Sequence, residues 1–251
     1  MYIGKLFKKL SNKHYSHKFK DLRIDSRKCK KNDIFFSIKG FKKDGNKFIK
    51  DAIKNGARTI ISNLKFKGKK KNILYIRNNN VRKLVPEIAS KFYQGIPNNL
   101  IAVTGTNGKS SIASFYFQIL NINKSKVATI GTLGIKTNRS NEQTDNTTLD
   151  PITIRKTLSF IKKKKIINTI LEASSHGLNQ HRLDGLKFDT SIFTNLSRDH
   201  LDYHKTYKNY LNAKLILFKK LTKRRGSVIY DNDIPESKIL KNICIKKDLK
   251  F

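Results

Sequence analysis

A glycine-rich turn followed by a lysine and a serine is the clearest chemical signal in the sequence. Positions 105–108 read Gly-Thr-Asn-Gly, and Lys109 and Ser110 follow directly. Glycines let backbone N–H groups surround a phosphate closely. At these places a lysine would reach the β- and γ-phosphates of a nucleotide, and a serine hydroxyl would hold Mg²⁺. The strict spacing requires glycine where Val103 stands, so the sequence predicts a shortened phosphate loop.

The flanking residues favour a phosphate loop over an ordinary glycine-containing turn. The apolar run Leu100–Val103 predicts a buried strand before the turn, and Ser110–Leu120 predicts an amphipathic helix after it. The N-terminus of that helix would direct partial positive charge at the phosphate. The residues predicted to bind the nucleotide are Gly105, Thr106, Asn107, Gly108, Lys109, Ser110 and Ser111.

Two more ionisable residues follow apolar strands further along the chain. Glu172 ends the predicted strand Ile167–Leu171, and His200 follows the predicted strand Thr190–Thr194 and a turn. Residues at the carboxyl ends of parallel strands face one ligand crevice, so both are expected near the phosphate loop.

Two hydrolase patterns are incomplete. His200 and His204 have the four-residue spacing of zinc ligands on a helix, but position 201 is leucine instead of the glutamate of a zinc peptidase. Positions 174–176 read Ser-Ser-His without the G-x-S-x-G elbow of a serine hydrolase. We therefore interpret His204 as a structural residue and favour phosphate chemistry.

Apolar strands alternating with helices predict an α/β fold of two parts, a small domain and a doubly wound, mainly parallel sheet. The boundary is expected in the Gly/Pro/Asn segment 95–99, which gives domains 1–97 and 98–251. The predicted strands are Leu22–Ile24, Ile34–Ile38, Thr59–Ser62, Ile73–Ile76, Leu100–Val103, Lys126–Ile130, Ile167–Leu171, Thr190–Thr194 and Ser227–Tyr230. The predicted helices are Asp44–Asn55, 81–93 with a kink or later start at Pro86, Ser110–Leu120, Ile152–Lys164 and Tyr207–Leu221.

The composition is strongly basic. The 251 residues include 54 Lys and Arg against 18 Asp and Glu, which gives a formal net charge of +36. The lysines are scattered rather than gathered in one arm, and lysine, asparagine and isoleucine share AT-rich codons. We therefore predict non-specific attraction of polyanions and no specific nucleic-acid binding. No stretch is long and apolar enough for membrane insertion, and two distant cysteines indicate a reduced, cytoplasmic protein.

Several strings, in order, carry a resemblance to a known family. The turn at 104–110 resembles the nucleotide loop of the Mur ligases and the related folylpolyglutamate synthases. Asn-Thr-Thr at 146–148, the strings 172–182 and 193–204, and Asn-Ala-Lys at 212–214 resemble the branch of the Mur ligase family that extends UDP-N-acetylmuramoyl-dipeptide to the tripeptide. The strings that resemble the family's uridine-binding domain are Ile24-Asp-Ser-Arg27, Asp33-Ile-Phe-Phe36 and 39–45.

The resemblance implies an ATP-dependent, amide-forming ligase of peptidoglycan synthesis, acting in cell-wall biogenesis, cell shape and cell division. ATP would convert the D-Glu carboxylate of UDP-N-acetylmuramoyl-L-Ala-D-Glu into an acyl phosphate, which the amine of a diamino acid, lysine or diaminopimelate, would attack. It also implies Mg²⁺ as a cofactor. The implied catalytic residues are Lys109, Glu172, His200 and Lys214, and the implied metal ligands are Ser110, Glu172, His200 and Lys214 as a carbamate.

The resemblance also assigns the two domains. Residues 1–97 would bind the UDP-sugar, and residues 98–251 would form the central ATP-binding domain. The residues implied to contact the UDP-muramoyl-dipeptide are Ile24, Ser26, Phe41, Lys42, Lys43, Asn146, Thr147, Thr148, Ser174, Gln180 and Arg182.

One family feature is not found in the sequence. The family's third domain carries an Asp-Asn-Pro-Arg motif for the incoming amino acid, and the nearest string here is Asp-Asn-Asp-Ile-Pro-Glu at 231–236. We expect a fragment without the C-terminal ligase domain, a split enzyme that works with a separately encoded one, or a decayed ligase. The alternatives are a truncated protein that binds ATP and the UDP-sugar without ligation, folylpolyglutamate synthase, which Asp25-Ser-Arg27 argues against, and a basic nucleic-acid binder.

Overall fold

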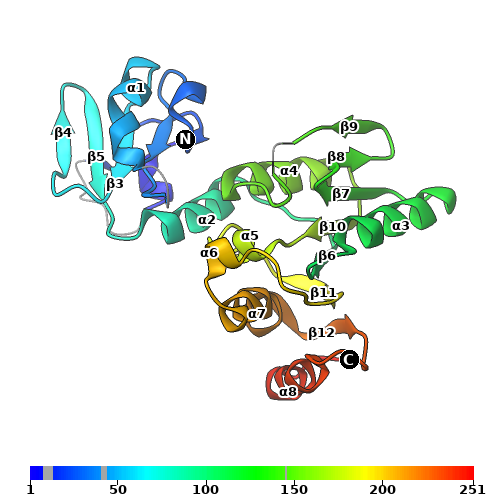
Figure 1. The fold of residues 1–251 in the computed structure, drawn as a ribbon. Helices are drawn as coiled ribbons and strands as arrows, with labels where there is room; N and C mark the ends of the chain where they lie inside the picture. The colour runs from blue at the N-terminus through cyan, green and yellow to red at the C-terminus, as the bar shows by residue number, and fades with distance from the viewer. Residues whose placement is uncertain (8–13, 41–43, 145) are drawn as a thin grey trace. The chain divides into compact units, whose positions relative to one another are not determined.

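A computed structural model describes residues 1–7, 14–40, 44–144 and 146–251, and Figure 1 shows its ribbon. The described residues form two compact units, Met1–Tyr93 and Gln94–Phe251. The division lies beside the Gly/Pro/Asn segment in which the sequence predicts a boundary. Within the described residues, every helix is too short or too polar to cross a membrane.

The first unit contains a five-stranded sheet with the order β1-β2-β3-β5-β4, in which only β4 is antiparallel to its neighbour. Its strands are β1 (Leu22–Arg23), β2 (Ile34–Phe36), β3 (Thr59–Ser62), β4 (Gly68–Lys70) and β5 (Ile73–Arg77). Its helical segments are η1 (Ile3–Lys5), η3 (Ser26–Lys28), η4 (Gly45–Phe48), α1 (Ile49–Lys54) and α2 (Val81–Phe92). Four of the five strands are predicted from the sequence, and β4 is not.

Helix α2 does not begin at Pro86, as one sequence interpretation proposed. It begins at Val81, where the side chain of Asn80 accepts a hydrogen bond of 3.1 Å from the N–H of Lys83, and it continues through Pro86. An asparagine cap stabilises a helix start by satisfying a free N–H group. Because Val81, Val85 and Pro86 are all buried, packing offsets the hydrogen bond that proline removes.

The second unit is built on a seven-stranded sheet with the order β12-β11-β6-β10-β7-β8-β9. The five strands from β12 to β7 are parallel, and the hairpin β8–β9, which the sequence analysis did not predict, adds two antiparallel strands. The strands are β6 (Asn99–Thr104), β7 (Val127–Gly131), β8 (Gly134–Thr137), β9 (Ser140–Glu142), β10 (Asn168–Glu172), β11 (Phe188–Phe193) and β12 (Thr222–Tyr230). The predicted α/β class with a mainly parallel sheet is confirmed.

The second unit contains the three helices predicted from the sequence, and also the short helices α5 and α6, which the sequence analysis did not predict. Its helical segments are α3 (Lys109–Ile122), α4 (Pro151–Lys163), α5 (Ser175–Asn179), α6 (Leu201–His204), α7 (Tyr207–Ile216), η5 (Leu217–Leu221) and α8 (Ser237–Lys247). The segment predicted as one helix, Tyr207–Leu221, is α-helical only to Ile216 and ends in the π-helical turn η5.

Helices cover both faces of the second sheet, which explains why the central residues of β6, Leu100–Val103, are all apolar. Leu100 and Ala102 belong to the large core shared with α4, η5 and α8, whereas Ile101 and Val103 pack with Ala113 of α3. Successive side chains of a strand point to opposite faces, so a strand covered on both sides needs no polar alternation.

The register of the central strands gathers the predicted site at one edge of this sheet. Glu172 at the end of β10 pairs with Val103 of β6, and Phe193 at the end of β11 pairs with Thr104. The phosphate-loop segment 105–108 therefore leaves β6 between the ends of β10 and β11, as the labels of Figure 1 allow the reader to follow.

Candidate active site

The phosphate loop passes very close to the end of β11. A Cβ atom built on Gly105 would overlap Oγ1 of Thr194, and Gly108, which caps α3, has a φ of +83°. Residues other than glycine rarely adopt this left-handed backbone conformation. Both glycines of the loop are therefore required, one by the close approach and the other by its φ angle.

Residues after β11 hold the loop in place. Asn195 accepts hydrogen bonds from the N–H of Thr106 through its carbonyl (2.9 Å) and from the N–H of Asn107 through its side chain (3.0 Å). Oγ1 of Thr194 donates to the carbonyl of Asn107 at 2.6 Å. These contacts fix the first half of the loop, and the N-terminus of α3 presents the N–H groups that a helix cannot satisfy internally.

The ammonium groups of two lysines point at the loop carbonyls. Nζ of Lys109 donates to the carbonyls of Gly105 (3.0 Å) and Thr106 (2.7 Å), and Nζ of the buried Lys214 donates to Gly105 at 2.6 Å. Burial lowers the pKa of Lys109. Burial and the nearby Lys109 charge lower the pKa of Lys214 to about 7, so a large share of Lys214 is neutral near neutral pH.

Glu172 forms the acidic side of the site. Its carboxylate is 2% exposed and accepts hydrogen bonds from Oγ of Ser110 (3.0 Å), from the N–H of Thr132 (3.0 Å) and from Oγ1 of Thr132 (3.1 Å). The predicted pair of metal ligands, Ser110 and Glu172, is therefore in direct contact at the start of α3.

This pair fits a magnesium ion bound together with phosphates. Mg²⁺ in nucleotide sites is held by one or two protein oxygens, with phosphate oxygens and water completing the octahedron. The Ser110 hydroxyl and the Glu172 carboxylate supply such oxygens. Among the described residues no group of three or more His, Cys, Asp or Glu side chains could hold a metal by itself. The donor set thus fits a phosphate-dependent Mg²⁺ site and not a site made by protein alone.

His200 lies in a group of aromatic rings with His176 and Tyr210. It has a φ of +53° and comes just before α6, and its ring centroid is 4.9 Å from that of His176 and 6.0 Å from that of Tyr210. Its side chain is 47% exposed, so its ring remains accessible to a ligand.

His204 is in a different position. It is 5% exposed, and its Nε2 lies 3.0 Å from Oγ of Ser175. Burial, followed by the charges of His176 and His200, lowers the pKa of His204 to about 4. The buried, neutral ring is consistent with the structural role that the sequence analysis gave it.

Four residues predicted to contact the dipeptide form one network behind Glu172. Oγ1 of Thr148 is 2.8 Å from the carbonyl oxygen of Glu172 and 3.0 Å from Oγ of Ser174. Arg182 donates to the carbonyl of Thr148 (2.6 Å) and to Oε1 of Gln180 (2.9 Å). Two more predicted contacts lie outside this network. Oγ1 of Thr147 accepts a hydrogen bond of 3.0 Å from Oγ1 of Thr132, and the side chain of Asn146 is exposed.

The first unit holds the other predicted substrate contacts. Ser26 begins η3, is 6% exposed, and accepts a hydrogen bond of 3.0 Å at its carbonyl from Nδ2 of Asn55. Ile24 lies in the loop after β1 and is partly buried. The predicted contacts Phe41, Lys42 and Lys43 lie outside the described residues.

Several residues that build the site received no role from the sequence. Thr132, Thr194, Asn195 and Tyr210 contact the loop, its lysines or Glu172. Thr132 and the pair Thr194-Asn195 directly follow β7 and β11, so the usable signal was a polar residue at the carboxyl end of a predicted parallel strand. Tyr210 lies inside α7, and nothing in its spacing distinguishes it from a core residue.

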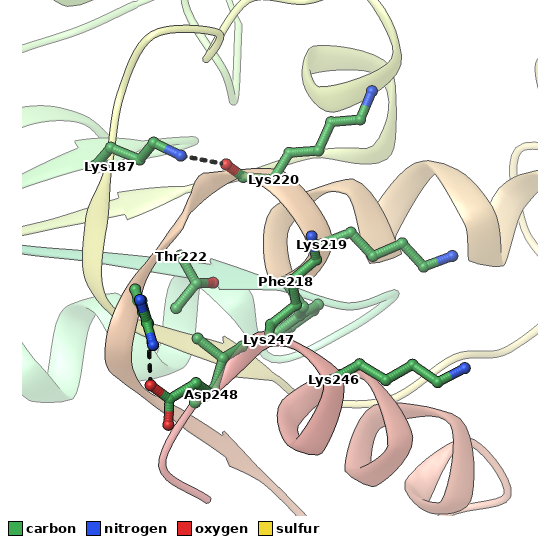
Figure 2. A pocket seen from close by; sticks show the side chains of 10 residues that line it. Lys187, Phe218, Lys219, Lys220, Thr222, Lys246, Lys247 and Asp248 are labelled. Carbon is green, nitrogen blue, oxygen red and sulfur yellow. Dashed lines mark hydrogen bonds and ion pairs between the residues drawn. The ribbon is translucent and has the colours of Figure 1, made fainter.

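A hollow of about 380 Å³ on the second unit is lined mainly by cations (Figure 2). Lys187 donates to the carbonyl of Lys220 at 2.8 Å, and Arg224 pairs with Asp248 at 3.1 Å. Cations at helix C-termini offset the partial negative charge of the last carbonyls. Because the hollow lies at the ends of η5 and α8, we interpret it as a solvated basic surface. Its other basic residues are Lys219, Lys246 and Lys247.

Comparison with protein families matches almost the whole chain. Residues 18–103 match the family described as "Mur ligase family, catalytic domain", and residues 103–251 match "Mur ligase middle domain".

Relatives from two bacterial genera are similar over most of the chain. The UDP-N-acetylmuramoyl-L-alanyl-D-glutamate--2,6-diaminopimelate ligase of Rickettsia montanensis is 41% identical over 239 residues, which is 94% of this chain and 50% of the relative. The ligase of the same name from Bradyrhizobium diazoefficiens is 39% identical over 210 residues, which is 84% of this chain and 43% of the relative. The chain thus spans about half the length of the relatives it matches.

Solved structures agree in fold. A structure of a ligase with that same name covers 100% of this chain and 51% of its own, with a TM-score of 0.83 and 27% identity. A MurF ligase from Thermotoga maritima in complex with ADP covers 92% of this chain and 49% of its own, with a TM-score of 0.64 and 19% identity, which is evidence for the fold alone.

Proposed function

Because this chain belongs to the Mur ligase family, we propose that it binds ATP and a UDP-muramoyl-peptide in an ATP-dependent, amide-forming ligase of peptidoglycan synthesis. The reaction would activate the D-Glu carboxylate of UDP-N-acetylmuramoyl-L-Ala-D-Glu as an acyl phosphate, and an amine would then attack it. We assign the two binding steps to this chain, in the cytoplasm, where the precursor is made. We assign delivery of the amine to the part of the relatives that the match does not cover.

The observation that carries this proposal is the contact between Ser110 and Glu172 directly beneath the phosphate loop. Phosphoryl transfer needs positioning and neutralised charge more than covalent help from the protein. In this arrangement Lys109 would exchange the carbonyls of Gly105 and Thr106 for the β- and γ-phosphate oxygens. Ser110 and Glu172 would hold Mg²⁺, which neutralises phosphate charge when it is bound.

We assign the ligands of a second Mg²⁺ ion to His200 and Lys214, in agreement with the family resemblance. A lysine must be neutral to react with CO₂, and burial already lowers the pKa of Lys214 to about 7. As a carbamate, Lys214 would become an anion close to the loop. His200, whose side chain is 47% exposed, would supply a ring nitrogen as a ligand.

We propose diaminopimelate as the incoming amino acid, supported by the names of the relatives. The UDP-sugar would contact Ile24 and Ser26 of the first unit, and the peptide would contact Asn146, Thr147, Thr148, Ser174, Gln180 and Arg182 of the second. In this account Arg182 exchanges its bonds to Gln180 and Thr148 for a substrate carboxylate, which a guanidinium can grip with two parallel hydrogen bonds.

Calorimetric titration of the 251-residue chain with ATP and Mg²⁺ tests the nucleotide site. Lys109→Ala should weaken ATP binding at least tenfold, because it removes the fixed cation of the loop. Lys163→Ala is the control, because it removes the same positive charge from an exposed position at the end of α4. It should leave the ATP affinity unchanged. Equal ATP affinity in the parent and in Lys109→Ala would overturn the assignment of the loop.

A further inference from the structure

Tyr210 is buried between the phosphate loop and Lys214, and it has no role in the proposed chemistry. Its side chain is among the largest fully buried ones and is 1% exposed. Its hydroxyl lies 3.2 Å from Oγ1 of Thr106, and Nζ of Lys214 lies 4.4 Å from the centroid of its ring. One side chain of α7 thus contacts both the loop and the lysine that the loop binds.

The Thr106 hydroxyl is held by more than Tyr210. Oγ1 of Thr106 also accepts the N–H of Ser197 at 3.0 Å. The carbonyl of Thr106 in turn accepts Nζ of Lys109 at 2.7 Å. The orientation of Thr106 is therefore linked to Tyr210 through its side chain and to Lys109 through its backbone. A shift of Thr106 would move the carbonyl that positions the loop lysine.

The ring of Tyr210 acts on the other lysine. A cation near an aromatic face is attracted by the ring quadrupole, more strongly where water is excluded. The Lys214 ammonium lies between this ring and the Gly105 carbonyl, which it reaches at 2.6 Å. Because Gly105 and Thr106 are adjacent, the ring and the hydroxyl of Tyr210 support the same two loop residues from α7.

We propose that Tyr210 is a positioning residue for the phosphate loop, and that its hydroxyl keeps Thr106 in the conformation that accepts ATP phosphates. This inference rests on the proposed nucleotide site. If this one buried hydrogen bond holds Thr106 in the conformation that accepts ATP, Tyr210→Phe should weaken ATP binding about fivefold, because the strength of one such bond then counts against binding. The apolar packing of the ring is kept in this variant.

The test compares ATP affinity, measured by calorimetry with Mg²⁺, and thermal unfolding for a set of variants of the 251-residue chain. Tyr116→Phe is the control, because it removes the same hydroxyl group from a half-buried tyrosine that accepts from Nδ2 of Asn99 at 3.4 Å and does not contact the loop. Thr106→Val and the double variant Thr106→Val/Tyr210→Phe complete a cycle that isolates the Tyr210–Thr106 contact.

Three results are expected together. Tyr210→Phe loses about fivefold in ATP affinity while Tyr116→Phe does not, and Tyr210→Phe causes no further loss when Thr106 is already valine. If Tyr210→Phe lowers the unfolding temperature but leaves ATP affinity unchanged, the residue is only structural and the inference is overturned. Additive losses in the cycle would overturn the Thr106 contact as its route. A parent chain that does not bind ATP would overturn the proposed function, and this inference with it.

Discussion

Lys109 and Lys214 direct their ammonium groups to the same oxygen atom, the backbone carbonyl of Gly105. Nζ of Lys109 lies 3.0 Å and Nζ of Lys214 lies 2.6 Å from it. One carbonyl thus holds two amino groups close together, and the charge of Lys109 adds to burial in lowering the pKa of Lys214. A ligand with several negative charges would relieve this repulsion, so the ligand-free loop is prepared for phosphates.

The stability of the chain should depend on pH through Lys214. Its pKa of about 7 in the folded protein is below the ordinary value of about 10.4 in the unfolded chain. Between these values the unfolded chain binds more protons, so this group makes the folded state more stable as pH rises. We expect the free energy of unfolding of the parent, relative to Lys214→Met, to rise by about 3 kcal/mol from pH 7 to pH 9.5.

Chemical denaturation in CO₂-free buffer with a chelator provides this measurement, because it keeps the amine free of carbamate and metal. The Lys214→Met variant corrects for the titration of all other groups. A difference between parent and variant that stays constant across the pH range would show that the buried amine keeps an ordinary pKa.

Gly105→Ala should disable the loop by crowding Thr194. The new Cβ would overlap Oγ1 of Thr194, which would displace the loop from β11. We expect at least a tenfold loss of ATP affinity in calorimetry. Adding Thr194→Ala removes the overlapping oxygen and should recover part of the loss. Parent-like ATP binding by Gly105→Ala would show that the close approach does not matter.

Glu172→Gln should separate binding of the nucleotide from binding of the metal. Glutamine keeps the size of the side chain. Its oxygen can still accept from the N–H of Thr132, and its NH₂ group can donate to the hydroxyls of Ser110 and Thr132, but it loses the charge that Mg²⁺ requires. ATP affinity without Mg²⁺ should change less than threefold, and the gain from adding Mg²⁺ should disappear. Glu142→Gln, at an exposed site on β9, is the control. A Mg²⁺ gain that survives in Glu172→Gln would exclude Glu172 as a ligand.

The basic surface should bind polyanions without selectivity. Counter-ion release makes such binding fall steeply with salt. We expect the chain to bind single-stranded DNA of any sequence at low salt and to lose it near physiological ionic strength, as measured by fluorescence anisotropy. A complex that depends on sequence and resists salt would contradict our interpretation of the charge.

The sequence predicted the strands of the parallel sheet and the location of the loop because these depend on local patterns. The apolar run before Gly105 and the helical spacing after Ser110 are such patterns. The hairpin β8–β9 was missed, since β8 has four residues with the single apolar side chain of Ile135, and β9 has three residues that are all polar and exposed. The π-helical end of α7 was also missed, because hydrophobic spacing does not distinguish a π turn from an α-helix.

The contacts of the candidate site could also be predicted only in part. Glu172 could be placed from the end of its strand, and its contact with Ser110 follows from the parallel register of β6 and β10. The contact between Tyr210 and Thr106 joins residues 104 positions apart. It depends on how α7 packs against the sheet, which no local pattern reports.

The proposed function requires this chain to bind the UDP-muramoyl-dipeptide of a peptidoglycan ligase. The most direct test is calorimetric titration of the 251-residue chain with UDP-N-acetylmuramoyl-L-Ala-D-Glu, with a folate as the competing ligand class. We predict saturable binding of the UDP-dipeptide, no binding of the folate, and loss of the UDP-dipeptide in Ser26→Trp, where a large ring replaces a small buried side chain. Binding of the folate without binding of the UDP-dipeptide would contradict the account.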